Sequence, residues 1–219
     1  MGRGHATMGA VVWLGVAEVG HLAGLEVAGW PLVLGTVICA GAALLPDMDH
    51  PEGTIAWSLG PLTYWLCRFT AWAADGHRRR THMWTFCVLM GLVVTLVAWL
   101  GGRWGAAVVA LLLSSLGWRA LSRRLRHVVP LLALGTAILT WSTYSLTVGL
   151  CLAVATTVGA WVHCLGDSLT NSGCAWAWPY RRKLGSPRWL RFSTGKAVEK
   201  WFTRVLYGLL GALVVLVVI

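Results

Sequence analysis

Histidine and aspartate side chains, which bind metal ions and exchange protons, are concentrated in three short stretches of this chain. The stretches read LLPDMDHP at 44–51, GHRRRTH at 76–82 and HCLGD at 163–167. Their candidate metal ligands are Asp47, Asp49, His50, His77, His82, His163 and Asp167. His5, near the N-terminus, is a further candidate ligand. Imidazole and carboxylate groups without a paired-cysteine motif suit zinc, manganese or iron.

The spacing within the stretches suits a shared ion. His163 and Asp167 are four residues apart, so on a helix they share one face and can bind the same ion. Asp47 and Asp49 are two residues apart, so in extended backbone their carboxylates point the same way and one could bridge two ions. Mixed His/Asp sites with an open position are typically catalytic, because a bound water needs room. We therefore predict one or two divalent ions, with Asp47 and Asp49 as the candidate catalytic residues, one of them serving as base for the attacking water.

The composition places these residues in a membrane protein. Of the 219 residues, 57% are hydrophobic and only 12% are charged, whereas a soluble domain carries about 25% charged residues. The bilayer must therefore be the solvent for most of the chain. The net charge of +10 would suggest nucleic acid as the partner of a soluble protein. Here the basic residues lie between apolar runs, which indicates membrane topology instead, and no nucleic-acid partner is expected.

Apolar runs of helical length must position the three stretches. A spanning helix needs roughly 20 mainly apolar residues. We expect an all-α, polytopic transmembrane helix bundle that forms a single domain over 1–219, with about seven spanning helices. The segment 55–73, broken at Gly60-Pro61, is expected to be re-entrant or interfacial. The spanning helices are predicted at 6–28, 31–46, 82–101, 104–118, 128–142, 144–165 and 201–219.

The parity of these crossings puts His5 and all three stretches on one side of the membrane. The same side holds every one of the 18 lysines and arginines except Arg103. Because segments rich in Lys and Arg stay in the cytoplasm, this side is predicted to be cytoplasmic, together with the N-terminus and the metal cluster. The charge asymmetry was not used to place the helices, so it supports the topology independently.

Basic residues inside the second stretch allow two interpretations. Arg78, Arg79 and Arg80 could hold the phosphate or another anionic group of a substrate beside the metal ligands. They could also serve topology and bind anionic lipid head groups. The His and Asp residues themselves could form an ion-pair network with arginines instead of a metal site. So many ionisable groups at membrane depth favour a functional site, because such groups are costly there.

The motifs LLPDMDHP at 44–51, HRRRTH at 77–82 and HCLGDSLTNSGCAWAWP at 163–179 resemble the YdjM-like family of bacterial inner-membrane proteins, described as metal-dependent hydrolases. The run FSTGKAVE at 192–199 is a weaker match. The resemblance implies a metal centre at the Asp and His residues of these motifs, in the inner membrane of a bacterium. It also implies that Glu199 is a further acid near the site. The chain departs from the family at Met83, where a serine often follows the second histidine of the middle motif.

Two functions of different classes fit these observations. The first is a zinc-type hydrolase at the cytoplasmic face that cleaves a phosphoester of a lipid or lipid-linked substrate. The second is a non-catalytic metal-binding membrane protein, either a scaffold or an ion carrier. A carrier needs polar groups along a path through the membrane, and no acidic residue lies between His82 and His163, which argues against ion passage. Membrane lipids are the expected partners, and the sequence does not fix an oligomeric state.

Overall fold

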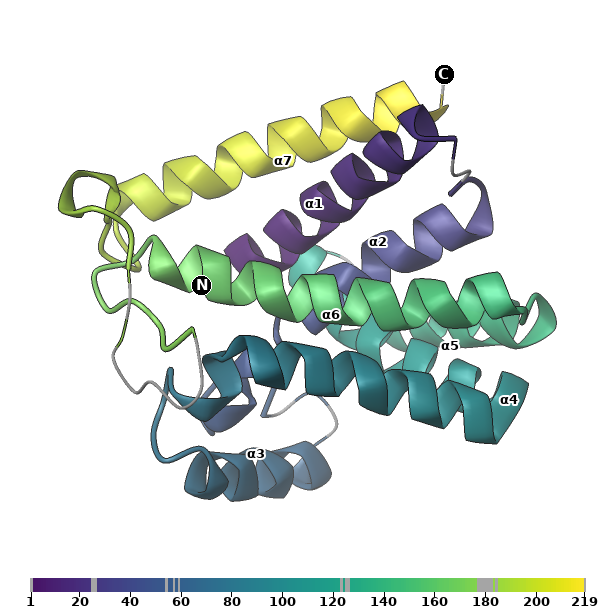
Figure 1. The fold of residues 1–219 in the computed structure, drawn as a ribbon, viewed down its shortest axis with the longest axis horizontal. Coiled ribbons are helices and arrows are strands. Elements are labelled where there is room, and N and C mark those ends of the chain that lie inside the picture. Colours follow the sequence, from purple (N-terminus) through teal and green to yellow (C-terminus); the bar gives the residue numbers. More distant parts are fainter. Residues whose placement is uncertain are drawn as a thin grey trace.

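The computed structural model describes residues 2–218 except 25–26, 54, 57, 59, 123, 125–126, 177–182 and 184. Within this part of the chain the regular structure is helical, with seven α-helices and no strand (Figure 1), which confirms the all-α class. The α-helices are α1 (Gly2–Leu22), α2 (Trp30–Ala42), α3 (Pro61–Ala73), α4 (Trp84–Leu121), α5 (Val129–Ser142), α6 (Leu146–Ser168) and α7 (Ala197–Val218). Short 3-10 helices are η1 (Leu45–Asp49), η2 (Arg80–His82) and η3 (Arg188–Leu190).

Helix α2 lies at the centre of the bundle. It packs against α1, α4 and α6, while α7 lies along the outer side of α1 and α5 packs on α4 (Figure 1). Small residues allow the backbones to approach closely, as is common between membrane helices. A Cβ atom added at Gly41 would lie 1.9 Å from the carbonyl oxygen of Leu113, and one added at Gly159 would lie 2.4 Å from that of Cys39. These contacts fix η1, at the end of α2, beside the end of α6.

Helix α4 contains a turn between the two helices predicted at 82–101 and 104–118. Gly102 has φ 52° and ψ −137°, a non-helical conformation that glycine adopts without a steric penalty. A Cβ atom added at Gly105 would lie 2.0 Å from the carbonyl oxygen of Val97, so the chain turns back on itself there. The helices predicted at 82–101 and 104–118 are therefore the two arms of this one element.

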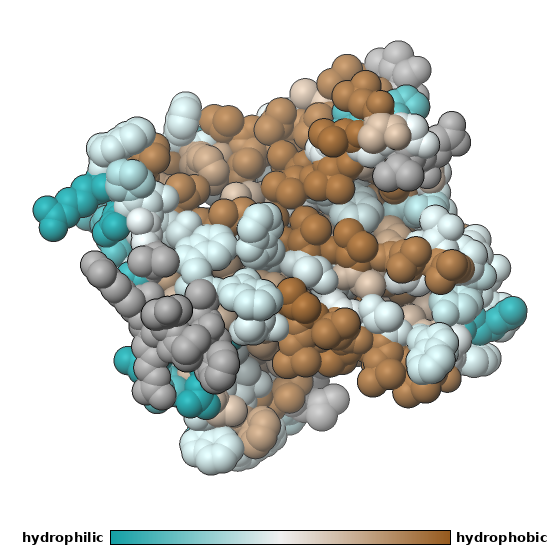
Figure 2. All heavy atoms as spheres, in the orientation of Figure 1, coloured by the Kyte–Doolittle hydropathy of each residue, from teal (hydrophilic) through white to brown (hydrophobic). Residues whose placement is uncertain are grey.

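The structure does not confirm seven spanning helices. By length and hydropathy, three segments of the described chain could cross a membrane: Trp30–Asp49, Trp84–Leu121 and Leu146–Ser168. Helix α5 has 14 residues, which at 1.5 Å per residue span about 21 Å, less than the hydrocarbon core of about 30 Å. Helix α1 begins at Gly2 and ends at Leu22, so its bounds lie several residues before the predicted 6–28. Figure 2 shows hydrophobic side chains over much of the face formed by α7, α6 and α4.

The segment predicted at 55–73 contains one helix, α3, which begins directly after Gly60. Its 13 residues are too few to cross a membrane. The helix exposes Trp65, Phe69 and Trp72, each more than 60% accessible. An apolar, aromatic face of this kind is typical of a helix that lies in a membrane interface.

Candidate metal centre

Two buried imidazole rings face each other where η2 meets α6. His82 ends η2, His163 lies in the last part of α6, and both side chains are 0% exposed. Their Nε2 atoms are 3.2 Å apart. Two nitrogens that bind one tetrahedral zinc ion at 2.0–2.1 Å lie about 3.3 Å from each other. The spacing of the two Nε2 atoms is therefore that of ligands to one ion.

Carboxylates from η1 and α6 flank the two Nε2 atoms. Oδ1 of Asp47 lies 3.5 Å from Nε2 of His163 and 4.0 Å from Nε2 of His82. Oδ2 of Asp167 lies 3.4 Å from Nε2 of His82 and 3.7 Å from Nε2 of His163. Each carboxylate thus brings one oxygen within 4.0 Å of both Nε2 atoms, and His163 and Asp167 face the same place, as their spacing predicts.

The surroundings of Asp167 Oδ2 indicate whether these four side chains can hold a cation. Its Oδ2 is buried and accepts no hydrogen bond from the described residues. The Nε atom of Arg78 is 2.8 Å away but lacks the alignment of a hydrogen bond. The Arg78 guanidinium therefore neutralises this carboxylate, while Oδ2 keeps lone pairs without a hydrogen bond that a further cation could use. The donor set of two imidazoles and two carboxylates therefore fits a divalent ion.

Nδ1 of each ring is held by a hydrogen bond to another group, so each ring turns its Nε2 towards the cluster. Nδ1 of His163 lies 2.7 Å from the carbonyl oxygen of Ala43, which can only accept, so this nitrogen carries the proton. Nδ1 of His82 lies 3.0 Å from Oγ1 of Thr81, and the Thr81 hydroxyl donates to Asp49. Metal-bound histidines are usually oriented in this way. Sequence reasoning did not single out Thr81, although it lies within the second motif and provides a hydroxyl that Met83 cannot.

Asp49 lies behind His82 rather than beside the two Nε2 atoms. Its buried carboxylate accepts hydrogen bonds from Nδ1 of His77 at 2.7 Å, from the backbone N–H of Arg78 at 3.1 Å and from the Thr81 hydroxyl. Residues 47–49 form a 3-10 helix with three residues per turn and not the extended backbone expected from their spacing. Asp47 and Asp49 therefore face different neighbours, and Asp49 holds His77 and Thr81 by hydrogen bonds.

The electrostatic effect of the carboxylates is clearest at His82. Burial opposes protonation of its ring, but hydrogen bonds and charges from Asp167 and Asp49 outweigh burial and raise the pKa of His82 to about 9. A cation that binds at Nε2 would replace this proton and occupy the same field of negative charge.

Arg78 joins the second stretch to the third. Its side chain is buried, and its Nη2 and Nη1 atoms donate to Asp167 Oδ1 at 3.0 Å and to Thr170 Oγ1 at 2.8 Å. The three arginines predicted to bind substrate are not gathered together. Arg79 is half exposed and pairs with Asp75, and exposed Arg80 donates to the carbonyl oxygen of Ala73. The guanidinium of Arg78 is thus committed to the cluster itself.

His77 and His50 lie at the exposed edge of the cluster. The His77 side chain is 39% exposed, and ligand atoms of His77, His82 and Asp47 lie within 4.8 Å of one another, so these three could hold an ion. His50 is exposed, and its ring centroid is 5.1 Å from that of His77. The structure therefore places His50 beside His77, at the exposed edge of the cluster.

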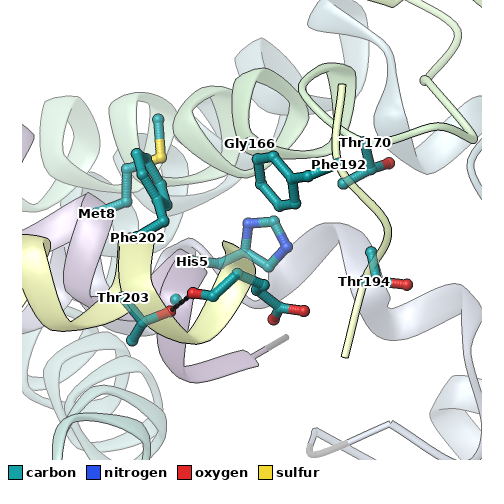
Figure 3. A pocket seen from close by; sticks show the side chains of 10 residues that line it. His5, Met8, Gly166, Thr170, Phe192, Thr194, Phe202 and Thr203 are labelled. Atoms are coloured by element: carbon teal, nitrogen blue, oxygen red, sulfur yellow. Dashed lines mark hydrogen bonds between the residues drawn. The ribbon is translucent and has the colours of Figure 1, made fainter. Parts of the chain in front are cut away.

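His5 lies on the opposite side of the cluster. Its ring stacks on His163 with centroids 4.0 Å apart, and its Nε2 is 3.4 Å from Asp167 Oδ1. His5, His163 and Asp167 form a second group that could hold an ion. Figure 3 shows His5 in the wall of a small cavity beside Phe192 and Phe202. Glu199 lines the same cavity and accepts a hydrogen bond from the N–H of Gly195, so it lies near His5 and not at the Nε2 pair.

Comparison with known proteins gives one match. The model of the family described as YdjM inner membrane protein matches residues 1–122 and 107–219, which together cover the whole chain. No curated protein and no solved structure matches.

Proposed function

Because this chain belongs to the YdjM inner membrane protein family, we propose that it is a metal-dependent hydrolase of the inner membrane, with its site at the cytoplasmic face. The observation that carries the proposal is the pair of Nε2 atoms of His82 and His163, 3.2 Å apart, with an oxygen of Asp47 and an oxygen of Asp167 each within 4.0 Å of both. A divalent ion held there, zinc in our proposal, would activate a water and polarise the bond to be cleaved.

Three of the four candidate ligands are buried, and the fourth is partly exposed. His82, His163 and Asp167 are at most 1% exposed, whereas the Asp47 side chain is 21% exposed. Asp47 is therefore the ligand that a substrate reaches first. Its second oxygen can accept the proton of an attacking water, which is the role of a general base. Asp49 and Thr81 keep the His82 ring in the tautomer that presents Nε2.

The proposed substrate is a phosphoester of a lipid or lipid-linked molecule. Asp47 and Asp167 lie at the ends of two candidate spans, Trp30–Asp49 and Leu146–Ser168. A site at that depth meets amphiphiles before it meets water-soluble molecules. The exposed guanidinium groups of Arg79 and Arg80 supply positive charge near the site for an anionic head group.

A second candidate function is a metal-stabilised scaffold without catalysis. The complete burial of both histidines and Asp167 favours it, because structural zinc sites are closed whereas catalytic sites keep an open position. The exposed fraction of Asp47 is the feature that favours the hydrolase.

Hydrolysis by the protein in phospholipid vesicles, loaded with zinc, tests the proposal. We expect wild type to release head groups from the phospholipid, and we expect Asp47→Asn to lower the rate by at least about 100-fold, because the amide cannot accept the proton. Asp75→Asn, an exposed aspartate outside the cluster, is the matched control. Stoichiometric zinc without cleavage of any phosphoester would favour the scaffold instead.

A further inference from the structure

An apolar groove lies beside η1, next to the metal centre. Leu45 and Met48 line it from η1, Leu66 and Cys67 from α3, and Leu113 and Leu116 from the second arm of α4. Its volume is about 230 Å³. Leu45 and Met48 are three residues apart, so in a 3-10 helix their side chains eclipse and point the same way. The same short helix thus presents apolar side chains to the groove and carboxylates to the histidines.

The groove opens onto the outer surface of the helix bundle. Leu66 is 47% exposed and Leu112, which also lines the groove, is 42% exposed. Leu112 belongs to the candidate span Trp84–Leu121, so the groove continues onto a surface that lipid would cover in a membrane. Helix α3 packs against η1 and is set apart at the lower edge of the bundle (Figure 1), with its aromatic side exposed.

We propose that this groove binds an aliphatic chain of the membrane lipid whose head group reaches the metal centre. Three hydroxyl groups in the lining, those of Ser58, Thr63 and Ser115, all donate to backbone carbonyl oxygens. The remaining lining is apolar and therefore suits the methylene groups of a chain better than a polar ligand. The volume is too small for a second helix, which is about 10 Å across. The occupant is thus a narrow hydrocarbon chain.

Met48 lies between the groove and the candidate metal ligands. Met48 lines the groove, and its neighbours in sequence are Asp47, the exposed ligand, and Asp49. A chain that lies along Leu113, Leu66 and Met48 brings the ester end of the lipid to Asp47. This inference rests on the proposed function for the reaction, but binding of the chain does not depend on catalysis. It defines the substrate class as lipids that carry an aliphatic chain next to the scissile ester.

Photochemical labelling tests the binding. The protein in vesicles is irradiated with a phosphatidylglycerol that carries a diazirine in its acyl chain, and the labelled peptides are mapped by mass spectrometry. We expect labels at Met48, Cys67 and Leu116, reduced at least about tenfold in Leu66→Trp, whose indole fills the groove. Leu131→Trp, at an exposed position of α5, should leave these labels unchanged. Equal labelling of the groove in both variants would overturn the proposal.

Zinc content and thermal stability of Leu66→Trp show whether the variant is folded, and Cys67→Phe provides a second way to fill the groove. Hydrolysis of long-chain and short-chain lipids with the same head group separates the two proposals. We expect the groove-filling variants to raise KM for the long-chain lipid at least about tenfold and to leave KM for the short-chain lipid unchanged, because the filled groove excludes the long chain. Groove labelling without any hydrolysis would contradict the hydrolase alone. Hydrolysis at the same rate for both chain lengths, without labelling of the groove, would contradict only the proposal that the groove binds the chain.

Discussion

Replacing His163 with alanine is expected to weaken zinc binding by more than about 100-fold. Loss of a residue that only orients a metal ligand costs about 10–100-fold in affinity, so loss of a ligand should cost more. The side chain lies at the centre of the cluster, with Nε2 3.2 Å from that of His82 and close to both Asp47 and Asp167. Elemental mass spectrometry of the purified protein and competition with a chelating dye measure the effect.

Two further variants make this result specific. His21→Ala removes an exposed histidine near the end of α1 and should leave zinc content unchanged. Asp49→Asn should reduce affinity by only about 10–100-fold, because Asp49 acts on the ion through Thr81 and His82. A wild-type zinc content in folded His163→Ala would show that the ring does not bind the ion.

Replacing Arg78 with methionine is expected to lower the free energy of unfolding of the zinc-free protein by about 3–5 kcal/mol, because it leaves the buried carboxylate of Asp167 without its partner. Zinc should restore part of this loss, because the ion neutralises the same carboxylate. Thermal unfolding in detergent, with chelator or with added zinc, measures both effects.

Arg79→Met is the matched control for this prediction. Arg79 is adjacent in sequence, but its pair with Asp75 is half exposed at 45% for both side chains. Exposed pairs contribute about 0–1 kcal/mol, so the control should unfold close to wild type. Equal unfolding temperatures for the two variants would mean that Arg78 does not hold Asp167 in the folded protein.

The sequence predicted the helical class and the meeting of the three motifs because both depend on chain-wide patterns. Apolar runs alternate with basic segments, and the predicted crossings put all three motifs on one side. The structure brings the motifs together but does not confirm the number of crossings. The turn at Gly101-Gly102 was also predictable, since glycine permits the positive φ that the reversal needs.

The division of roles within the motifs depends on local geometry that a sequence pattern does not contain. Asp47 and Asp49 were treated alike, but the 3-10 helix turns them towards different neighbours. Arg78 was grouped with Arg79 and Arg80, although only Arg78 has its side chain buried against Asp167. The number of spanning helices depends on packing that hydropathy does not record, as the 14-residue α5 illustrates.

X-ray absorption spectroscopy of protein loaded with one equivalent of zinc tests the central claim most directly. Three buried thiols lie close to the cluster and are alternative ligands for the ion: those of Cys87, Cys164 and Cys174. We predict a spectrum with two imidazole ligands and carboxylate oxygens at about 2.0–2.1 Å and no sulfur. A sulfur contribution at about 2.3 Å, or the spectrum of hydrated zinc, would contradict a metal centre built by His82, His163, Asp47 and Asp167.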